Sequence, residues 1–367
     1  MGRQLGVSED YLATGRERDE DKSVLIEAEI ALRLDERETA AEGYTRALES
    51  AETRDERARA LEGLGELAYR EGKPREAIAR LEEAQVLWGG DLLDHPSAAE
   101  TLGRAYAALD EYEAATSIFR RSLDAAEARN DLMETVRFAV LLANAHIDRG
   151  NFSEAEALLE KSVSAAPDAK DPIFRARLYW SQSRLHTMQQ DHGRAARYAR
   201  KALDLLELTE HTYYTAQAHQ LLAHIELDRE RPEEALSLLE RGLSLLGQSG
   251  NQLDRALFKL EEARALIQLE RPSEAASLAM EAVGILSDAH PEDAGRGYAL
   301  IAEVYEQLGD AQRALELYEL ASDKLSRASG RYLVDVYQKR ARLLEAEGRK
   351  DEALEVLKRA VTVQASS

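Results

Sequence analysis

Residues 72–84 read GKPREAIARLEEA, and the pattern returns as GNFSEAEALLEKS at 150–162, GDAQRALELYELA at 309–321 and GRKDEALEVLKRA at 348–360. An alanine five residues after the first residue of each copy marks the repeat. With weaker copies included, the nine marker alanines are Ala40, Ala77, Ala115, Ala155, Ala195, Ala235, Ala275, Ala314 and Ala353. Their spacing of 37–40 residues predicts a protein built from stacked structural repeats.

Each repeat has the length and the turn residues of two helices. Before the turn of the second repeat, residues 58–71 form an amphipathic segment; Gly72 follows it, and Pro74 opens the next segment. Glycine tolerates the left-handed backbone that ends a helix, and proline suits a first helical turn because its missing N–H would have no partner there. Because Gly150, Gly309 and Gly348 occupy the place of Gly72, we expect one helical hairpin in each repeat.

Side-chain size along the second helix of each hairpin predicts how the repeats pack. The marker alanine and a small residue seven places on share one helical face, so that neighbouring helices can approach closely. The bulky residues between these small ones are Leu81, Phe119, Leu159, Leu239 and Tyr318. A single hairpin of this kind does not bury its apolar face, and it must therefore stack on its neighbours.

Composition supports an all-α protein and narrows the partners. There are 48 Lys and Arg against 69 Asp and Glu, a net charge of −21, and no cysteine. This charge argues against a nucleic-acid surface or an anionic membrane surface. The absence of cysteine excludes disulfides and thiolate metal sites, and no apolar run or signal sequence indicates a membrane span or secretion. We therefore expect a soluble, cytoplasmic protein.

The alternation of small, bulky and small residues resembles the tetratricopeptide (TPR) family, as do Leu64-Gly65 and Leu102-Gly103 followed by the aromatic Tyr106. The resemblance covers residues 21–365. It departs from the family in its longer repeat, near 40 residues rather than about 34, and in alanine replacing several first-helix glycines. It implies a right-handed α-solenoid of about nine hairpins, about 75–85% helical where an average protein is near one third. Arrays with such long repeats resemble the sensor regions of bacterial signal-sensing regulators.

Residues 1–20 do not follow the repeat. GRQLGVSEDYLATGRE (2–17) resembles the closing helix of an Xre/Cro-type helix-turn-helix domain, whose DNA-reading helices would lie upstream. The alternative is a short N-terminal helix that caps the array, with Ser8 as its N-cap. The predicted organisation is thus 1–20 as a short helix or domain remnant and 21–367 as the array. In either case we expect no specific binding of duplex DNA by these residues alone.

Motifs for catalysis and cofactors do not appear, and we predict no catalytic residue, metal ligand or cofactor. Gly295, Arg296 and Gly297 supply two glycines of a dinucleotide-binding motif, but no strand precedes them, and we interpret them as a loop between repeats. His219 and His224 are the only close histidine pair. Their spacing of five places them on different helical faces, which disfavours a metal site.

A strip on the first helices is the predicted binding surface. When each repeat is numbered with its marker alanine at 20, positions 2, 5 and 9 share the face turned away from the partner helix. The proposed strip takes Arg104, Asn144, Arg184, His224 and Arg264 from position 9, Arg137 and Arg177 from position 2, and Trp180 and Gln220 from position 5. Gln217 and Arg296 also occupy position 2.

These residue types suit a peptide ligand, because Arg binds a carboxylate through two hydrogen bonds and Trp180 offers an apolar anchor. The TPR resemblance implies that the amide of Asn144 bonds a peptide backbone and that nearby basic residues bind a terminal carboxylate. Under the alternative interpretation, the Arg residues pair with neighbouring Glu and Trp180 packs between repeats.

Two functions remain open on this reasoning. The first is the sensor portion of a transcriptional regulator, which binds a peptide or protein segment that is acidic or ends in a carboxylate. Ligand binding would then alter the pitch of the superhelix or the interface of a homodimer. The second is a constitutive adaptor that assembles protein complexes without a signal ligand. The absence of catalytic motifs disfavours an enzyme.

Overall fold

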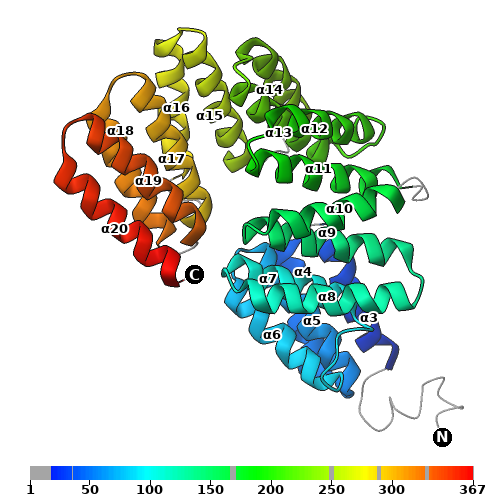
Figure 1. The fold of residues 1–367 in the computed structure, drawn as a ribbon. Helices are drawn as coiled ribbons and strands as arrows, with labels where there is room; N and C mark the ends of the chain where they lie inside the picture. Colours follow the sequence, from blue (N-terminus) through cyan, green and yellow to red (C-terminus); the bar gives the residue numbers. More distant parts are fainter. Residues whose placement is uncertain are drawn as a thin grey trace, which may run out of the picture. The chain divides into compact units, whose positions relative to one another are not determined.

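The computed structural model describes residues 18–34, 36–165, 171–247, 252–286, 291–326 and 330–366. These residues are 85% helical and include no strand, which confirms the all-α prediction. Eighteen described helices follow one another as nine hairpins (Figure 1). Their bounds are α3 Arg18–Arg33, α4 Arg37–Ser50, α5 Arg54–Arg70, α6 Pro74–Leu87, α7 Pro96–Ala108, α8 Tyr112–Ala128, α9 Leu132–Asp148, α10 Phe152–Ala165, α11 Pro172–Met188, α12 His192–Leu206, α13 Thr212–Asp228, α14 Pro232–Leu246, α15 Gln252–Gln268, α16 Pro272–Leu286, α17 Pro291–Gln307, α18 Ala311–Leu325, α19 Gly330–Ala346 and α20 Lys350–Ser366.

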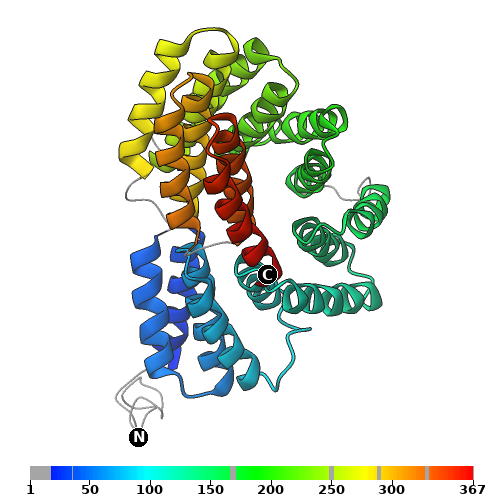
Figure 2. The same ribbon diagram turned by 60° about the vertical axis from the view of Figure 1, so that its left-hand side comes forward.

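The chain divides into two compact units, Met1–Phe138 and Ala139–Ser367, and the division falls within α9. We call them the N-terminal unit and the C-terminal unit. In the C-terminal unit the hairpins from α11 to α20 lie side by side in chain order, as both ribbon views show (Figures 1 and 2). The segment 1–20 that we expected to precede the array lies outside the described residues, except for the first three residues of α3.

The packing register predicted from the repeat is confirmed. All nine marker alanines are buried, with at most 1% of their surface exposed. The bulky residues between the small ones, such as Phe119 and Tyr318, are buried too. Because adjacent hairpins share contacts of this kind, the buried side chains form a series of clusters along the hairpins of each unit.

Glycines on the helices mark close crossings, and they correct one prediction. A Cβ on Gly103 would lie 2.3 Å from the Phe119 ring, and so only glycine fits there. Gly295 and Gly297, which we expected in a loop, instead lie inside α17. A Cβ on Gly295 would meet Leu325 at 2.5 Å, and one on Gly297 would meet Leu286 at 2.4 Å. These two glycines therefore serve helix packing.

The turns inside the hairpins use the left-handed backbone that the glycines predicted. Gly72 has φ 73° and Gly150 has φ 81°. The same place in other repeats is filled by Asp110, Gln190, Glu230 and Glu270, each with φ between 58° and 61°. A left-handed turn is thus required by the hairpin whether or not the residue there is glycine.

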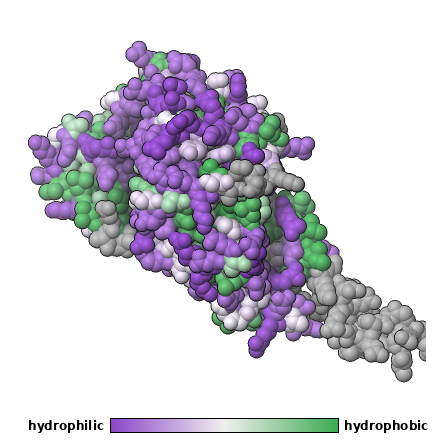
Figure 3. Space-filling model, turned by 45° about the vertical axis from the view of Figure 1, so that its right-hand side comes forward, coloured by the Kyte–Doolittle hydropathy of each residue, from purple (hydrophilic) through white to green (hydrophobic). Residues whose placement is uncertain are grey.

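The surface agrees with the high charge of the chain. The face drawn in Figure 3 is mostly hydrophilic, with small groups of hydrophobic side chains between the polar ones. None of the helices in the described ranges has both the length and the apolar character needed to span a bilayer.

Candidate functional site

A cavity of about 430 Å³ lies within the C-terminal unit and is lined mainly by the first helices of five successive hairpins. Its apolar wall comes from Trp180, Leu221, Leu257, Ala299, Leu300, Leu325, Tyr332 and Val336, and its polar wall from Gln217, Gln220, His224, Glu261, Arg296, Glu303, Asp335 and Lys339. Leu325, at the end of α18, is the only lining residue from a second helix. First helices therefore form most of the wall of this cavity, and its role in binding remains a prediction.

Three residues of the predicted strip, Trp180, Gln220 and His224, line this cavity. Trp180 also packs against the core formed by α11–α14, so that it has one side in the core and one at the cavity. Trp180 thus lies at the cavity and also has the packing role of the alternative interpretation, whereas its role as a ligand anchor remains a prediction.

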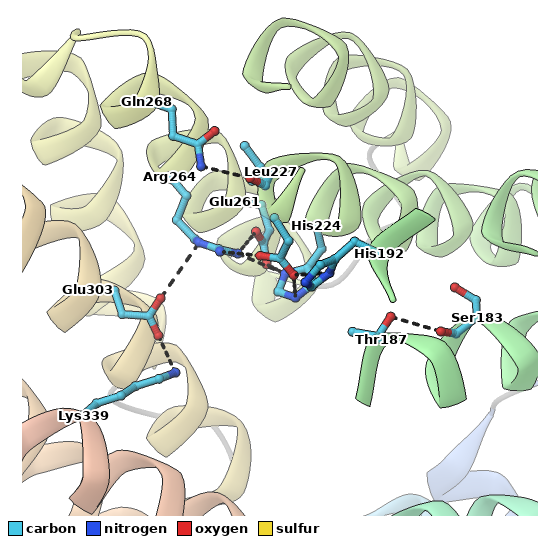
Figure 4. Close-up of polar contacts among 11 residues, drawn as sticks. Ser183, Thr187, His192, His224, Leu227, Glu261, Arg264, Gln268, Glu303 and Lys339 are labelled. Atoms are coloured by element: carbon cyan, nitrogen blue, oxygen red, sulfur yellow. Dashed lines mark hydrogen bonds and ion pairs between the residues drawn. The ribbon is translucent and has the colours of Figure 1, made fainter. Parts of the chain in front are cut away.

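In the polar part of the cavity wall, His224 and Glu261 belong to a network with Arg264 (Figure 4). The Nδ1 atom of His224 lies 2.9 Å from Oε1 of Glu261, and Nη1 of Arg264 donates to Oε2 of the same carboxylate at 2.8 Å. The Glu261 side chain is only 7% exposed and that of Arg264 14%. Burial of a charge is tolerated when it is paired and hydrogen-bonded in this way.

The network continues across α17 to α19. The Nε of Arg264 lies 4.0 Å from Oε2 of Glu303, and Nζ of Lys339 donates to Oε1 of Glu303 at 2.7 Å. Lys339 also lies 2.9 Å from Oδ2 of Asp335. Salt-linked side chains thus join α13, α15, α17 and α19, four of the helices that line the cavity.

Protonation states follow from these contacts. Glu261 raises the pKa of His224, although burial acts in the opposite direction. Burial alone would raise the pKa of Glu261, but the charges of His224 and Arg264 outweigh it and hold that pKa well below its ordinary value. The carboxylate therefore stays ionised and favours a protonated His224.

Arg184 and Arg264 each pair with an acid of the preceding repeat, and the sequence did not lead us to predict these two partners. Arg184 forms an ion pair with Asp148, and Nη2 of Arg264 lies 3.3 Å from Oδ1 of Asp228. In both cases the acid lies 36 residues earlier, at position 13 of the preceding repeat. A search for opposite charges one repeat apart would have found these partners.

Besides Arg184 and Arg264, two further strip residues of the C-terminal unit do not line the cavity, namely Asn144 and Arg177. The Oδ1 atom of Asn144 is buried without a hydrogen-bond partner in the described part of the chain. Arg177 is exposed on α11 and forms no ion pair with any described residue. Their predicted roles in binding remain predictions.

Arg104 and Arg137 belong to the N-terminal unit, and each is paired with an acid there. Nη2 of Arg104 lies 2.9 Å from Glu100, one helical turn away. Arg137 lies 3.2 Å from Glu134 and 3.7 Å from Glu100. This pairing agrees with the alternative we considered for the strip, in which its Arg residues bond neighbouring acids.

The histidine pair separates as its spacing predicted. Nε2 of His219 lies 3.6 Å from Glu207, whereas His224 faces Glu261. Within the described ranges, no three His, Asp or Glu side chains come together in a way that could hold a metal ion.

Comparison with known proteins agrees with the repeat and the fold. The model of the MalT-like TPR region matches residues 64–366, and a tetratricopeptide repeat model matches residues 27–91. No curated protein sequence matches the chain.

Among solved structures, the apo form of the quorum sensor NprR from B. thuringiensis is 15% identical, with 83% of this chain and 87% of that chain covered and a TM-score of 0.67. A Rap protein complexed with Competence and Sporulation Factor is 17% identical, with 91% and 90% covered and a TM-score of 0.63. The Rap conjugation gene regulator of plasmid pLS20, in complex with the Phr* peptide, is 15% identical, with 74% of each chain covered and a TM-score of 0.59. At these identities the likeness is one of fold. Because the MalT-like TPR region model matches most residues of this chain, the chain belongs to the MalT-like TPR region family.

Proposed function

We propose that the protein is a peptide-binding sensor whose C-terminal unit holds a peptide or protein segment in the cavity between its first helices. The observation that carries this proposal is the cavity itself, because five hairpins contribute side chains to one concave site of about 430 Å³. That volume is in the range of ligand pockets in proteins, about 300–1,000 Å³.

The chemistry of the wall supports a peptide. Trp180, Leu257 and Leu300 offer apolar contacts, whereas Gln220 offers an amide that makes no hydrogen bond to any described residue. A side-chain amide presents both a donor and an acceptor, which match the C=O and N–H groups of a peptide backbone. The Rap proteins of similar fold are complexed with Competence and Sporulation Factor and with the Phr* peptide.

We also propose the cellular role and the assembly that the sequence predicts. The chain acts in the cytoplasm, without catalytic activity, as the sensor portion of a transcriptional regulator that can form a homodimer. It does not itself bind DNA. The remaining strip residues, including Asn144 and Arg184, extend the binding surface. Arg104 and Arg137 form the part of that surface that belongs to the N-terminal unit. An in-frame helix-turn-helix upstream of Met1 in the coding sequence would support the regulatory part.

The test is a selection of peptides from a random display library by the wild-type chain and two variants. Trp180→Ala removes the anchor at the cavity, and the matched control Trp88→Ala removes the other tryptophan, which stacks on His95 in the N-terminal unit. We expect the wild type and the control to enrich the same peptides and Trp180→Ala to lose them, with circular dichroism confirming equal helix content.

Affinity is then measured in solution. In a Trp88→Phe background Trp180 is the only tryptophan, and its emission reports occupancy of the cavity directly. A bound peptide should also raise the melting temperature, since ligand binding adds RT ln(1 + [L]/Kd) to the stability of the folded state. Enrichment unaffected by Trp180→Ala would exclude the cavity as the site. Failure to enrich any peptide, together with stabilisation by a partner protein only, would support the constitutive adaptor instead.

A further inference from the structure

Arg296 is the one lysine or arginine of the cavity wall that has no acidic partner among the described residues. It lies on α17 at repeat position 2, is exposed, and forms no ion pair with any described residue. The other lysine or arginine of the wall, Lys339, is bound by both Glu303 and Asp335. An unpaired guanidinium in a concave site is a ready partner for an anionic ligand group.

The guanidinium of Arg296 is also positioned. Its central carbon lies 4.8 Å from the centroid of the Tyr332 ring, in a cation–π contact. The ring covers one face of the guanidinium and leaves its edge, which carries the N–H donors, available to a ligand. A guanidinium held in this way loses less conformational freedom when it binds a carboxylate through two hydrogen bonds.

The acids of the same wall do not compete for Arg296. Glu261 is held by His224 and Arg264 and is only 7% exposed, and Glu303 is held by Lys339. They retain their charges, however, so that the cavity as a whole is not strongly positive. A ligand with one carboxylate suits this balance better than a dianion, because a second charge would approach Glu303 or Asp335.

We propose that Arg296, supported by Tyr332, binds one carboxylate of the ligand, either the C-terminal carboxylate of a peptide or an Asp or Glu side chain. This proposal rests on the proposed function, because it takes the cavity to be the peptide site. It places the carboxylate contact at Arg296 rather than at Arg184, since Arg184 is already paired with Asp148. Apolar side chains of the ligand then lie against Trp180 and Leu300, with Gln220 near its backbone.

The probe is an array of synthetic random pentapeptides attached through their N-termini, made in four sets. Two sets have a free C-terminus and two an amidated one, and within each pair one set contains Asp and Glu and the other does not. We expect the wild type to bind no peptide of the amidated set that lacks Asp and Glu. The set that binds best identifies which source supplies the carboxylate.

The best peptide is then measured in solution against Arg296→Gln, with Arg197→Gln as control. Arg197 is an exposed arginine on α12, without an ion pair in the described structure and outside the cavity. Arg296→Gln should weaken binding at least tenfold, Arg296→Lys should weaken it less, and Arg197→Gln should not change it.

A double-mutant cycle makes the assignment specific. Removing the carboxylate from the peptide should weaken binding to the wild type but not weaken binding to Arg296→Gln any further. Equal affinity of the wild type and Arg296→Gln, or strong binding of peptides that lack a carboxylate, would overturn the role of Arg296 while leaving peptide binding in the cavity intact. If the wild type bound none of the four sets, both proposals would fail.

Discussion

The first helices of the two units carry acids in similar positions but place them in opposite electrostatic environments. In the N-terminal unit, positions 5 and 9 of the second repeat are Glu62 and Glu66. Burial raises the pKa of Glu62 to about 7, and the neighbouring charge of Glu66 adds to the rise. In the C-terminal unit, the pKa of the buried Glu261 is instead lowered.

Positively charged neighbours explain why the pKa of Glu261 is lowered and that of Glu62 is raised. Glu261 accepts hydrogen bonds from both His224 and Arg264. Near Glu62, Arg59 forms an ion pair with Glu29 at 2.6 Å, and Arg70 bonds Glu66. Burial acts to raise the pKa of both acids, and the positive groups within bonding distance decide which of the two stays charged.

The largest effect should come from breaking the paired site. Glu261→Ala leaves Arg264 and His224 buried without their anion, and we expect a loss of about 3–5 kcal/mol in the free energy of unfolding. Urea denaturation provides the measurement. As a control, Glu274→Ala removes an exposed partner of Arg271 and should cost less than about 1 kcal/mol. Similar costs for the two variants would show that the network does not stabilise the unit.

The stability cost of overpacking a marker position, unlike the effect of removing a buried acid, should be similar in the two units. Ala77→Phe and Ala155→Phe both place a large ring at a fully buried marker position. Each should lose about 1–3 kcal/mol or more, because overpacking forces neighbouring helices apart. Ala157→Phe, at an exposed position on the same helix as Ala155, should change little. If Ala157→Phe proved as costly in denaturation as Ala155→Phe, the helix register would be wrong.

Replacing Glu62 in the N-terminal unit should change stability in the opposite direction to replacing Glu261. A folded-state pKa raised to about 7 for Glu62 means that the folded protein binds more protons than the unfolded chain between the ordinary pKa and 7. Stability contributed by Glu62 is therefore present at low pH and is lost as the pH rises through 7. Glu62→Gln should raise the free energy of unfolding by about 1–3 kcal/mol at pH 8.

Denaturation of Glu62→Gln and the wild type across pH 4–8 checks this difference, which should disappear near pH 4. The matched Glu261→Gln variant should be less stable than the wild type at pH 7. A stabilising effect of both substitutions would remove the contrast between the units.

The smallest effect concerns the turns. Gln190 has φ 60° and Gly72 has φ 73°, although they occupy the same repeat position in different units. Because a residue with a Cβ is strained there, Gln190→Gly should stabilise and Gly72→Gln should destabilise, each by about 0.5–1 kcal/mol. Melting temperatures measured in parallel would test both, and shifts of the same sign would show that the turns differ between the units.

Much of the fold could be predicted because the same hairpin pattern occurs nine times along the sequence. The marker alanines, the turn at Gly72 and the proline that opens α6 depend on contacts within a hairpin or between adjacent ones. The interpretation of Gly295 and Gly297 as a loop was wrong because these glycines are explained by contacts with neighbouring helices. Glycine is unfavourable in a helix by its own propensity, and only the approach of Leu325 and Leu286 shows why α17 contains it.

The lining of the candidate site was predictable only in part. Repeat position placed Trp180, Gln220 and His224 on one wall, since residues at equivalent positions of stacked hairpins face the same way. It did not separate a paired cation such as Arg184 from an unpaired one such as Arg296, because a partner one repeat away is a matter of side-chain geometry.

The helical repeat, its register and the face on which a ligand site could form follow from the order of residues along the chain, since the periodic burial of small and bulky side chains permits one arrangement of each hairpin. Which charges are paired, and where a cavity opens, depends on the folded arrangement of the helices. Coulomb interactions and hydrogen bonds depend on distances of a few ångströms between side chains of different helices. The repeat period does not specify those distances.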